Sequence, residues 1–162
     1  MMNDITITEN KKLFTDIELL YREDKKYYDL AITDTGDLKA DKSFDTGINL
    51  ALFTDGRADK SEVSNPEDQR GTIVDLFTNG YRNGSKLWLL EQSRLDAGAV
   101  NRAIDYCKNA LQYFVDLSLV EKVSVSGYLT SKGVVLTIVV KCLNGTIDKY
   151  KYEAWENSIY KQ

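Results

Sequence analysis

An apolar stripe between Val100 and Val115 limits the possible folds more than any other feature of this sequence. Its apolar side chains recur every three or four residues, which is the spacing of one face of an α-helix. Asp96 and Gly98 precede the stripe and mark where the helix begins. We therefore predict a helix over this range whose apolar face points into the core.

Three runs of strand-forming residues follow this helix. The run VEKVSVSGYL alternates apolar and polar side chains, GVVLTIVVKCL is almost continuously apolar, and TIDKYKYEAW alternates again. Turn residues separate the runs at 131–133 and at Asn144-Gly145. We predict an α+β fold with an antiparallel C-terminal sheet of about three or more strands and two to three helices packed on one face.

The first third of the chain is rich in short alternating runs. DITITEN, LFTDIELLY and YYDLAITDTGDL are separated by charged residues and predict two or three short strands, either as an arm or as a local hairpin. A length of 162 residues with 43% hydrophobic side chains suits one domain. We therefore expect residues 1–40 to belong to the same domain as the α+β part, residues 41–162.

A second helix is predicted from Phe44 to near Gly56, where a long polar segment begins. Residues 55–71 contain the only proline, Pro66, and almost no apolar side chains, so this segment must run over the surface as a loop. Long loops in compact domains are usually functional or disordered. Beyond it, Trp88 within the run LWLL is predicted to anchor a short buried segment.

Composition excludes several classes of function. The formal net charge of −4 argues against a protein that binds nucleic acid, which needs a concentrated positive surface. Neither a membrane-spanning run nor a signal-peptide pattern is present, so we expect no membrane partner and a soluble compartment. The absence of histidine removes the usual general base near neutral pH and the commonest transition-metal ligand.

Candidate metal and phosphate sites lack the required spacing, so we expect no cofactor. Cys107 and Cys142 match no zinc or redox pattern and are interpreted as small core residues. The aspartates of DTGDLKADKSFD miss the spacing of a calcium loop, and TNGYRNGSK lacks the spacing of a P-loop. Solvated turns account for both segments.

The loop carboxylates offer one enzymatic alternative. Asp55, Asp59 and Glu62 contain the two acids that a glycosidase requires. One of these acids would need a raised pKa, whereas Arg57 and Lys60 lie among them in a solvated loop and would lower it. A charged docking surface is therefore the favoured interpretation.

Three motifs occur in a fixed order, within TGINLALFTDGRAD, QRG and GSKLWLLEQSR. With them, the chain resembles the baseplate protein family of Mu-like contractile-tail phages and prophages, the forty-six family. In that family L-x-T-D-x-R-A, R-G and G-S-x-L-W-L-L recur in this order. The resemblance covers about residues 29–140. Thr72 and Ile73 depart from it, because the family commonly has aromatic residues after R-G.

The resemblance implies a structural protein of the virion rather than an enzyme. The expected role is a wedge subunit, similar to the lysozyme-like small wedge protein of T-even phages, that links baseplate, hub and sheath. It implies baseplate, hub and sheath proteins as partners, multiple copies in the baseplate, and assembly in the cytoplasm of the bacterial host. The matching positions are Leu52, Thr54, Asp55, Arg57, Ala58, Arg70, Gly71, Gly84, Ser85, Leu87, Trp88, Leu89 and Leu90.

We expect the sheet edge and the charged loop to contact neighbouring tail proteins, by lending or accepting a strand. Arg57 and Arg70 are expected to pair with carboxylates, within the protomer or across an interface. For Trp155, on the last strand, a core role is an equal alternative. A carbohydrate hydrolase using Asp55 or Glu62, and an adaptor unrelated to phages, are the other hypotheses. The expected interface residues are Thr54, Asp55, Arg57, Asp59, Arg70, Gly71, Tyr150, Tyr152 and Trp155.

Overall fold

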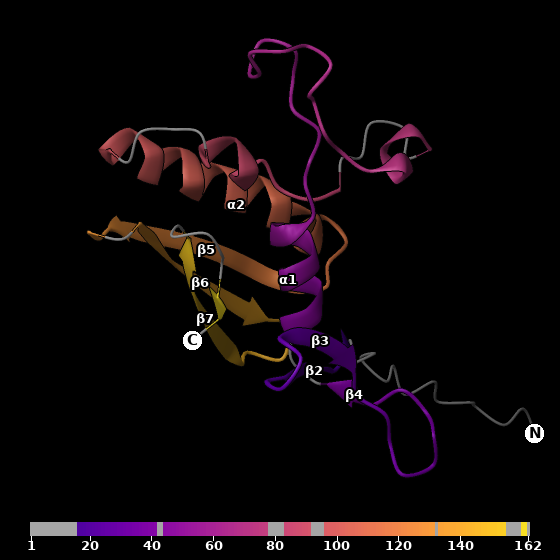
Figure 1. Cartoon of the computed structure of the whole chain (residues 1–162). Helices are drawn as coiled ribbons and strands as arrows, with labels where there is room; N and C mark the ends of the chain where they lie inside the picture. The colour runs from indigo at the N-terminus through magenta and orange to yellow at the C-terminus, as the bar shows by residue number, and fades with distance from the viewer. Residues whose placement is uncertain are drawn as a thin grey trace, which may run out of the picture. The chain divides into compact units, whose positions relative to one another are not determined.

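The chain separates into two compact units, residues 1–46 and 47–162, which are described in turn (Figure 1). The computed structural model describes residues 16–41, 44–77, 83–91, 96–131, 133–154 and 160–161, and the statements below concern these ranges. The predicted strand in DITITEN and the predicted interface residue Trp155 lie outside them.

The described residues of the first unit form two small antiparallel sheets, as predicted for this strand-rich segment. Strand β2 (Leu19–Arg22) pairs with β3 (Tyr27–Leu30) as a hairpin, and β1 (Asp16–Ile17) pairs with β4 (Ala40–Asp41). The backbone amide of Glu18, between β1 and β2, donates to the Lys39 carbonyl at 2.9 Å. This bond lengthens the short hydrogen-bond ladder between β1 and β4.

Helix α1 (Asp45–Phe53) follows, close to the range that the sequence predicts. It buries Ile48, Ala51 and Leu52, which recur at helical spacing. The helix ends before the expected Gly56 because residues 54–56 form backbone bonds with a later segment instead of continuing the helix.

The second unit is built on an antiparallel sheet. Its strands are β5 (Val120–Leu129), β6 (Val134–Cys142), β7 (Ile147–Ala154) and the short β8 (Tyr160–Lys161), in the order β5-β6-β7-β8. Between β6 and β7 the Gly145 amide donates to the Cys142 carbonyl at 3.0 Å, where the sequence predicts the turn. The predicted meander and the α+β fold class are confirmed.

Helix α2 (Ala97–Asp116) lies along the sheet and packs mainly on β5 (Figure 1). Asp96 caps its first turn, accepting a hydrogen bond from the Ala99 amide at 2.8 Å. Most of the predicted apolar stripe is buried, and Cys107 within it has no exposed surface. No helix in the described ranges is long and apolar enough to cross a membrane.

In the described part of the chain between α1 and α2 lie two short 3₁₀ helices, η1 (Ile73–Leu76) and η2 (Leu87–Leu90). Helix η2 carries Trp88 into the core, as predicted. In contrast, Ile73 and Phe77 are 74% and 79% exposed, so these two apolar side chains lie at the surface.

Candidate functional site

The candidate site begins where the chain leaves α1 and crosses the segment before η2. The Gly56 amide donates to the Ser85 carbonyl at 2.7 Å, and the Ser85 amide donates to the Thr54 carbonyl at 2.9 Å. The Ser85 hydroxyl donates to the Leu52 carbonyl at 2.6 Å, which satisfies a carbonyl at the end of α1. These bonds fix the start of the polar loop to the G-S-x-L-W-L-L segment.

Gly84 allows this close crossing. Its φ of +84° lies in the left-handed region, and a Cβ at this position would lie 2.2 Å from the Thr54 carbonyl oxygen. Any side chain would therefore separate the two backbones. Gly84 of the third motif must therefore be a glycine, because Thr54 of the first motif lies so close to it.

Arg70 connects the second motif to the same structure. Its Nη1 donates to Asp55 Oδ2 at 3.0 Å, and its guanidinium carbon lies 4.3 Å from the centroid of the Trp88 ring. The indole Nε1 of Trp88 in turn donates to the Gly56 carbonyl at 2.9 Å. The guanidinium of Arg70 thus stacks on an aromatic ring and pairs with a carboxylate. These two contacts hold the end of the loop, at Arg70, close to its beginning, at Asp55.

Lys86 forms a second anchor for the loop. Its ammonium lies 2.6 Å from Glu62 Oε2 and 3.2 Å from Asp59 Oδ2. Burial lowers the pKa of Lys86, but the hydrogen bonds and charges of Glu62 and Asp59 outweigh it and raise the pKa above its ordinary value. The same Glu62 oxygen accepts from the Asp59 amide at 2.7 Å, so the three residues form one network.

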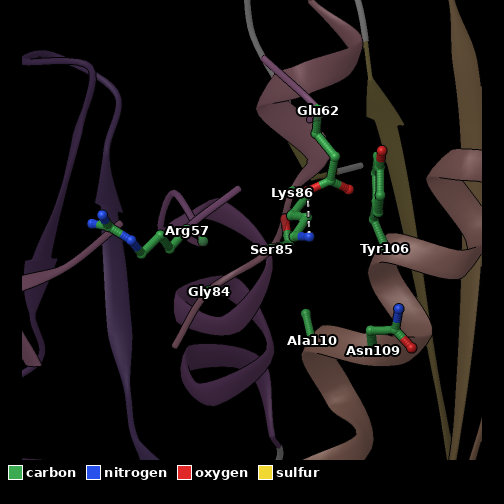
Figure 2. A pocket seen from close by; sticks show the side chains of 9 residues that line it. Arg57, Glu62, Gly84, Ser85, Lys86, Tyr106, Asn109 and Ala110 are labelled. Carbon is green, nitrogen blue, oxygen red and sulfur yellow. Dashed lines mark hydrogen bonds and ion pairs between the residues drawn. The ribbon is translucent and has the colours of Figure 1, made fainter. Parts of the chain in front are cut away.

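A hollow of about 270 Å³ lies between this network and α2 (Figure 2). Tyr106, Asn109 and Ala110 of α2 line one wall, and Glu62 and Lys86 line the opposite wall. Burial, and secondarily the charge of Glu62, raises the pKa of the Tyr106 hydroxyl. The hydroxyl is therefore neutral near pH 7 and able to donate a hydrogen bond to a polar group that enters the hollow.

The predicted interface residues have different surroundings. Arg57 is exposed, and its Nη2 donates to Gln69 Oε1 at 3.1 Å, while Gly71 lies directly beside Arg57. Asp55 and Arg70 form the pair described above, and Asp59 is exposed beside Lys86. Tyr150 and Tyr152 are buried on the sheet, with 5% and 1% exposure. They lie on the same face of the sheet as α2, and the Tyr152 ring packs against the Phe53 ring of α1, with 5.6 Å between the ring centroids. They are not part of the accessible surface of this chain.

The carboxylates proposed for a glycosidase are all held by cations. Asp55 binds Arg70, whereas Asp59 and Glu62 share Lys86. None of them lies in the apolar setting that a general acid requires. Among the described residues, no three histidine, cysteine, aspartate or glutamate side chains gather as a candidate metal site.

Sequence reasoning missed Lys86, Tyr106 and Asn109. Lys86 lies 24 residues from Glu62 in the chain, and its position inside the third motif is the one sequence signal that could have indicated it. Tyr106 and Asn109 lie on α2, outside its buried stripe. A polar helix face has the same sequence pattern whether it lines a hollow or faces solvent, so the sequence could not distinguish the two cases.

Comparison with known proteins relates this chain to a family of phage proteins. The family model described as "Phage protein GP46" matches residues 44–146. The chain is 28% identical to "Baseplate protein gp46" of Escherichia phage Mu over 129 residues, covering 76% of this chain and 86% of that protein. It is 30% identical to "Mu-like prophage FluMu protein gp46" of Haemophilus influenzae over 121 residues, covering 74% and 84%. The matched range contains the whole crossing and the hollow.

Proposed function

Because the chain belongs to the GP46 family of phage proteins, we propose that it is a structural component of the baseplate of a contractile phage tail or prophage-derived particle. The name of the phage Mu relative, a baseplate protein, supports this assignment. The observation that carries the proposal is the anchored loop, because its fixation by Ser85, Trp88 and Lys86 leaves a surface of charged side chains in a defined position.

The loop is suited to hold a neighbouring subunit. A protein that presents a pre-organised loop loses less conformational entropy on binding than one that must order it. Arg57 is exposed on this loop, and a guanidinium provides several donors for a carboxylate of a partner. We infer that the other predicted interface residues of this segment hold the loop in the shape that presents Arg57 to the partner. These residues are Thr54, Asp55, Asp59, Arg70 and Gly71.

The finer role that we propose is a wedge subunit, present in several copies in the virion, that links baseplate, hub and sheath. Strand β5 lies at one end of the strand order and offers a second contact, because an edge strand can pair with a strand from a neighbour. Assembly would take place in the cytoplasm of the bacterial host. In this role the chain needs no catalytic activity.

The decisive experiment replaces Arg57 with alanine in the phage or prophage that encodes the chain. We expect electron microscopy of induced lysates to show few or no assembled contractile tails, while circular dichroism of the purified variant shows an intact fold. Arg102→Ala, an exposed arginine on α2, is the matched control and should assemble normally. Wild-type numbers of contractile tails from Arg57→Ala would contradict the proposed loop contact.

A separate assay addresses enzymatic activity. Purified protein should not clear a peptidoglycan suspension, because Asp55, Asp59 and Glu62 are all engaged by cations. Robust clearing that is lost in Glu62→Gln would replace the structural role with hydrolysis.

A further inference from the structure

The sheet of the second unit has one face that α2 does not cover. The direction of the side chains follows from Gly127, where a Cβ would lie 3.6 Å from Ile104 of α2. Side chains alternate along a strand, so Lys122 of β5 points to the opposite face. Lys122 pairs with Lys141 of β6, which pairs with Ile147 of β7.

Four lysines occupy this open face among the described residues. Paired residues share a face, and Lys149 and Lys151 follow Ile147 at intervals of two along β7. Three of the lysines are exposed, and the side chain of Lys141 is 45% exposed. We name this group, Lys122, Lys141, Lys149 and Lys151, the lysine face.

This arrangement is unfavourable in the isolated chain. Like charges directly opposite each other on neighbouring strands destabilise a sheet, and Lys122 lies opposite Lys141. Glu121 lies 2.6 Å from Lys141 and offsets part of the repulsion. The formal net charge of the chain is −4, so the lysine face is a positive region on an acidic protein. Such a region fits a negatively charged surface.

The loop of the same chain carries a suitable negative surface. Within the turn Asn65–Asp68, the Glu67 amide donates to Asn65 Oδ1 at 3.1 Å, and the Asp68 amide donates to the Asn65 carbonyl at 2.9 Å. Both carboxylate side chains, Glu67 and Asp68, are exposed, whereas Asp59 and Glu62 are engaged by Lys86. We name the residues 65–68 the acidic turn.

The two surfaces cannot meet within one molecule. The loop lies on the α2 side of the sheet, whereas the lysine face points to the other side (Figure 1). A contact between them therefore requires two copies. Because the two surfaces are different, the contact is head-to-tail, and its repetition gives a ring or an open filament.

We propose that the lysine face of one copy binds the acidic turn of a second copy. A nucleic acid fits less well, because the lysines are interspersed with serine, threonine and valine and the whole chain is acidic. The inference rests on the proposed function only in treating the loop as a contact surface. Its test uses the purified chain, so its failure leaves the baseplate role standing.

The test uses sedimentation velocity of the full chain at low salt. The face variant is Lys149→Glu with Lys151→Glu, and the turn variant is Glu67→Lys with Asp68→Lys. The wild type should associate with increasing concentration and dissociate in high salt. Each variant alone should associate roughly tenfold more weakly or not at all.

Mixing the variants identifies the two surfaces. An equal mixture should associate again, because the intact turn of the face variant binds the intact face of the turn variant and the reversed turn binds the reversed face. The chain carrying all four reversals should associate again. Lys108→Glu, at an exposed position of α2, should behave as the wild type.

Three results would overturn the proposal. The first is a wild type that stays monomeric at low salt and high concentration. The second is a mixture that does not associate although both variants are folded by circular dichroism. The third is a monomeric wild type that binds double-stranded DNA through the lysine face, because this result would assign the face to a polyanion.

Discussion

The guanidinium of Arg70 lies over the indole ring of Trp88, with 4.3 Å between the guanidinium carbon and the ring centroid. Arg70 itself has a φ of +46°, a conformation that a residue with a side chain adopts only when its surroundings compensate. The stacking and the bond to Asp55 provide that compensation. The arginine and tryptophan of two separate motifs therefore act as one unit that closes the loop.

Replacing Arg70 with lysine should weaken this unit. Lysine keeps the charge but loses the planar group that stacks on Trp88 and binds Asp55. We expect a loss of about 1 kcal/mol in the free energy of unfolding, measured by urea denaturation. A Trp155→Phe background leaves Trp88 as the only tryptophan, so its fluorescence should also change in the folded state. Unchanged stability and emission would show that the stacking contributes nothing.

Gly84→Ala should be among the most destabilising single substitutions. The new Cβ would lie 2.2 Å from the Thr54 carbonyl oxygen, so the crossing of the two segments would have to open. We expect a loss of more than about 3 kcal/mol, or no folding, because backbone strain and steric overlap add.

Gly145→Ala is the matched control for this substitution. Gly145 has a φ of +85°, almost the same as Gly84, but nothing lies within 4 Å of an added Cβ. We expect a loss of about 1 to 2 kcal/mol from the left-handed conformation alone. Equal losses for the two alanine variants would refute the role of the close crossing.

The Lys86 network should respond to high pH. The pKa of Lys86 is raised above its ordinary value of 10.5, so its stabilising effect is complete below that pH and is lost as pH rises through the raised pKa. At pH 7, Lys86→Met should lose about 1 kcal/mol relative to the wild type. This difference should shrink at pH 11, as measured by urea denaturation. A difference that stays constant, as for a purely steric role, would argue against the ion pairs.

Cys107 should not react with thiol reagents in the folded protein. Burial raises the pKa of its thiol to about 12, so at pH 8 only roughly one thiol in ten thousand is ionised. In a Cys142→Ala variant, a colorimetric thiol reagent should label Cys107 only after urea unfolds the chain. Rapid labelling in native buffer would indicate that α2 opens from the sheet.

The regular elements could be predicted because each has its own periodicity. The stripe from Val100 to Val115 and the runs after residue 120 place α2 and the sheet where the structure has them. The loop of residues 55–71 was recognised because a segment without apolar side chains cannot be buried. The burial of Trp88 followed from its apolar neighbours in the run LWLL.

Side-chain partners could not be predicted in the same way. Tyr150 and Tyr152 alternate as residues of a half-exposed strand do, and only the packing shows that their face is the covered one, with the Tyr152 ring 5.6 Å from that of Phe53. Likewise, Ile73 and Phe77 are apolar but exposed, which their residue types alone do not predict.

The sequence by itself determined the fold class, the two helices, the meander and the three motifs that relate the chain to its family, since all of these depend on local pattern. The tertiary structure decided what the motifs do. Arg70 contacts both Asp55 and Trp88, which come from separate segments of the chain. Lys86 forms a hydrogen bond with Glu62, which precedes it by 24 residues. Such contacts depend on how the backbone crosses itself, and sequence spacing contains no record of that crossing.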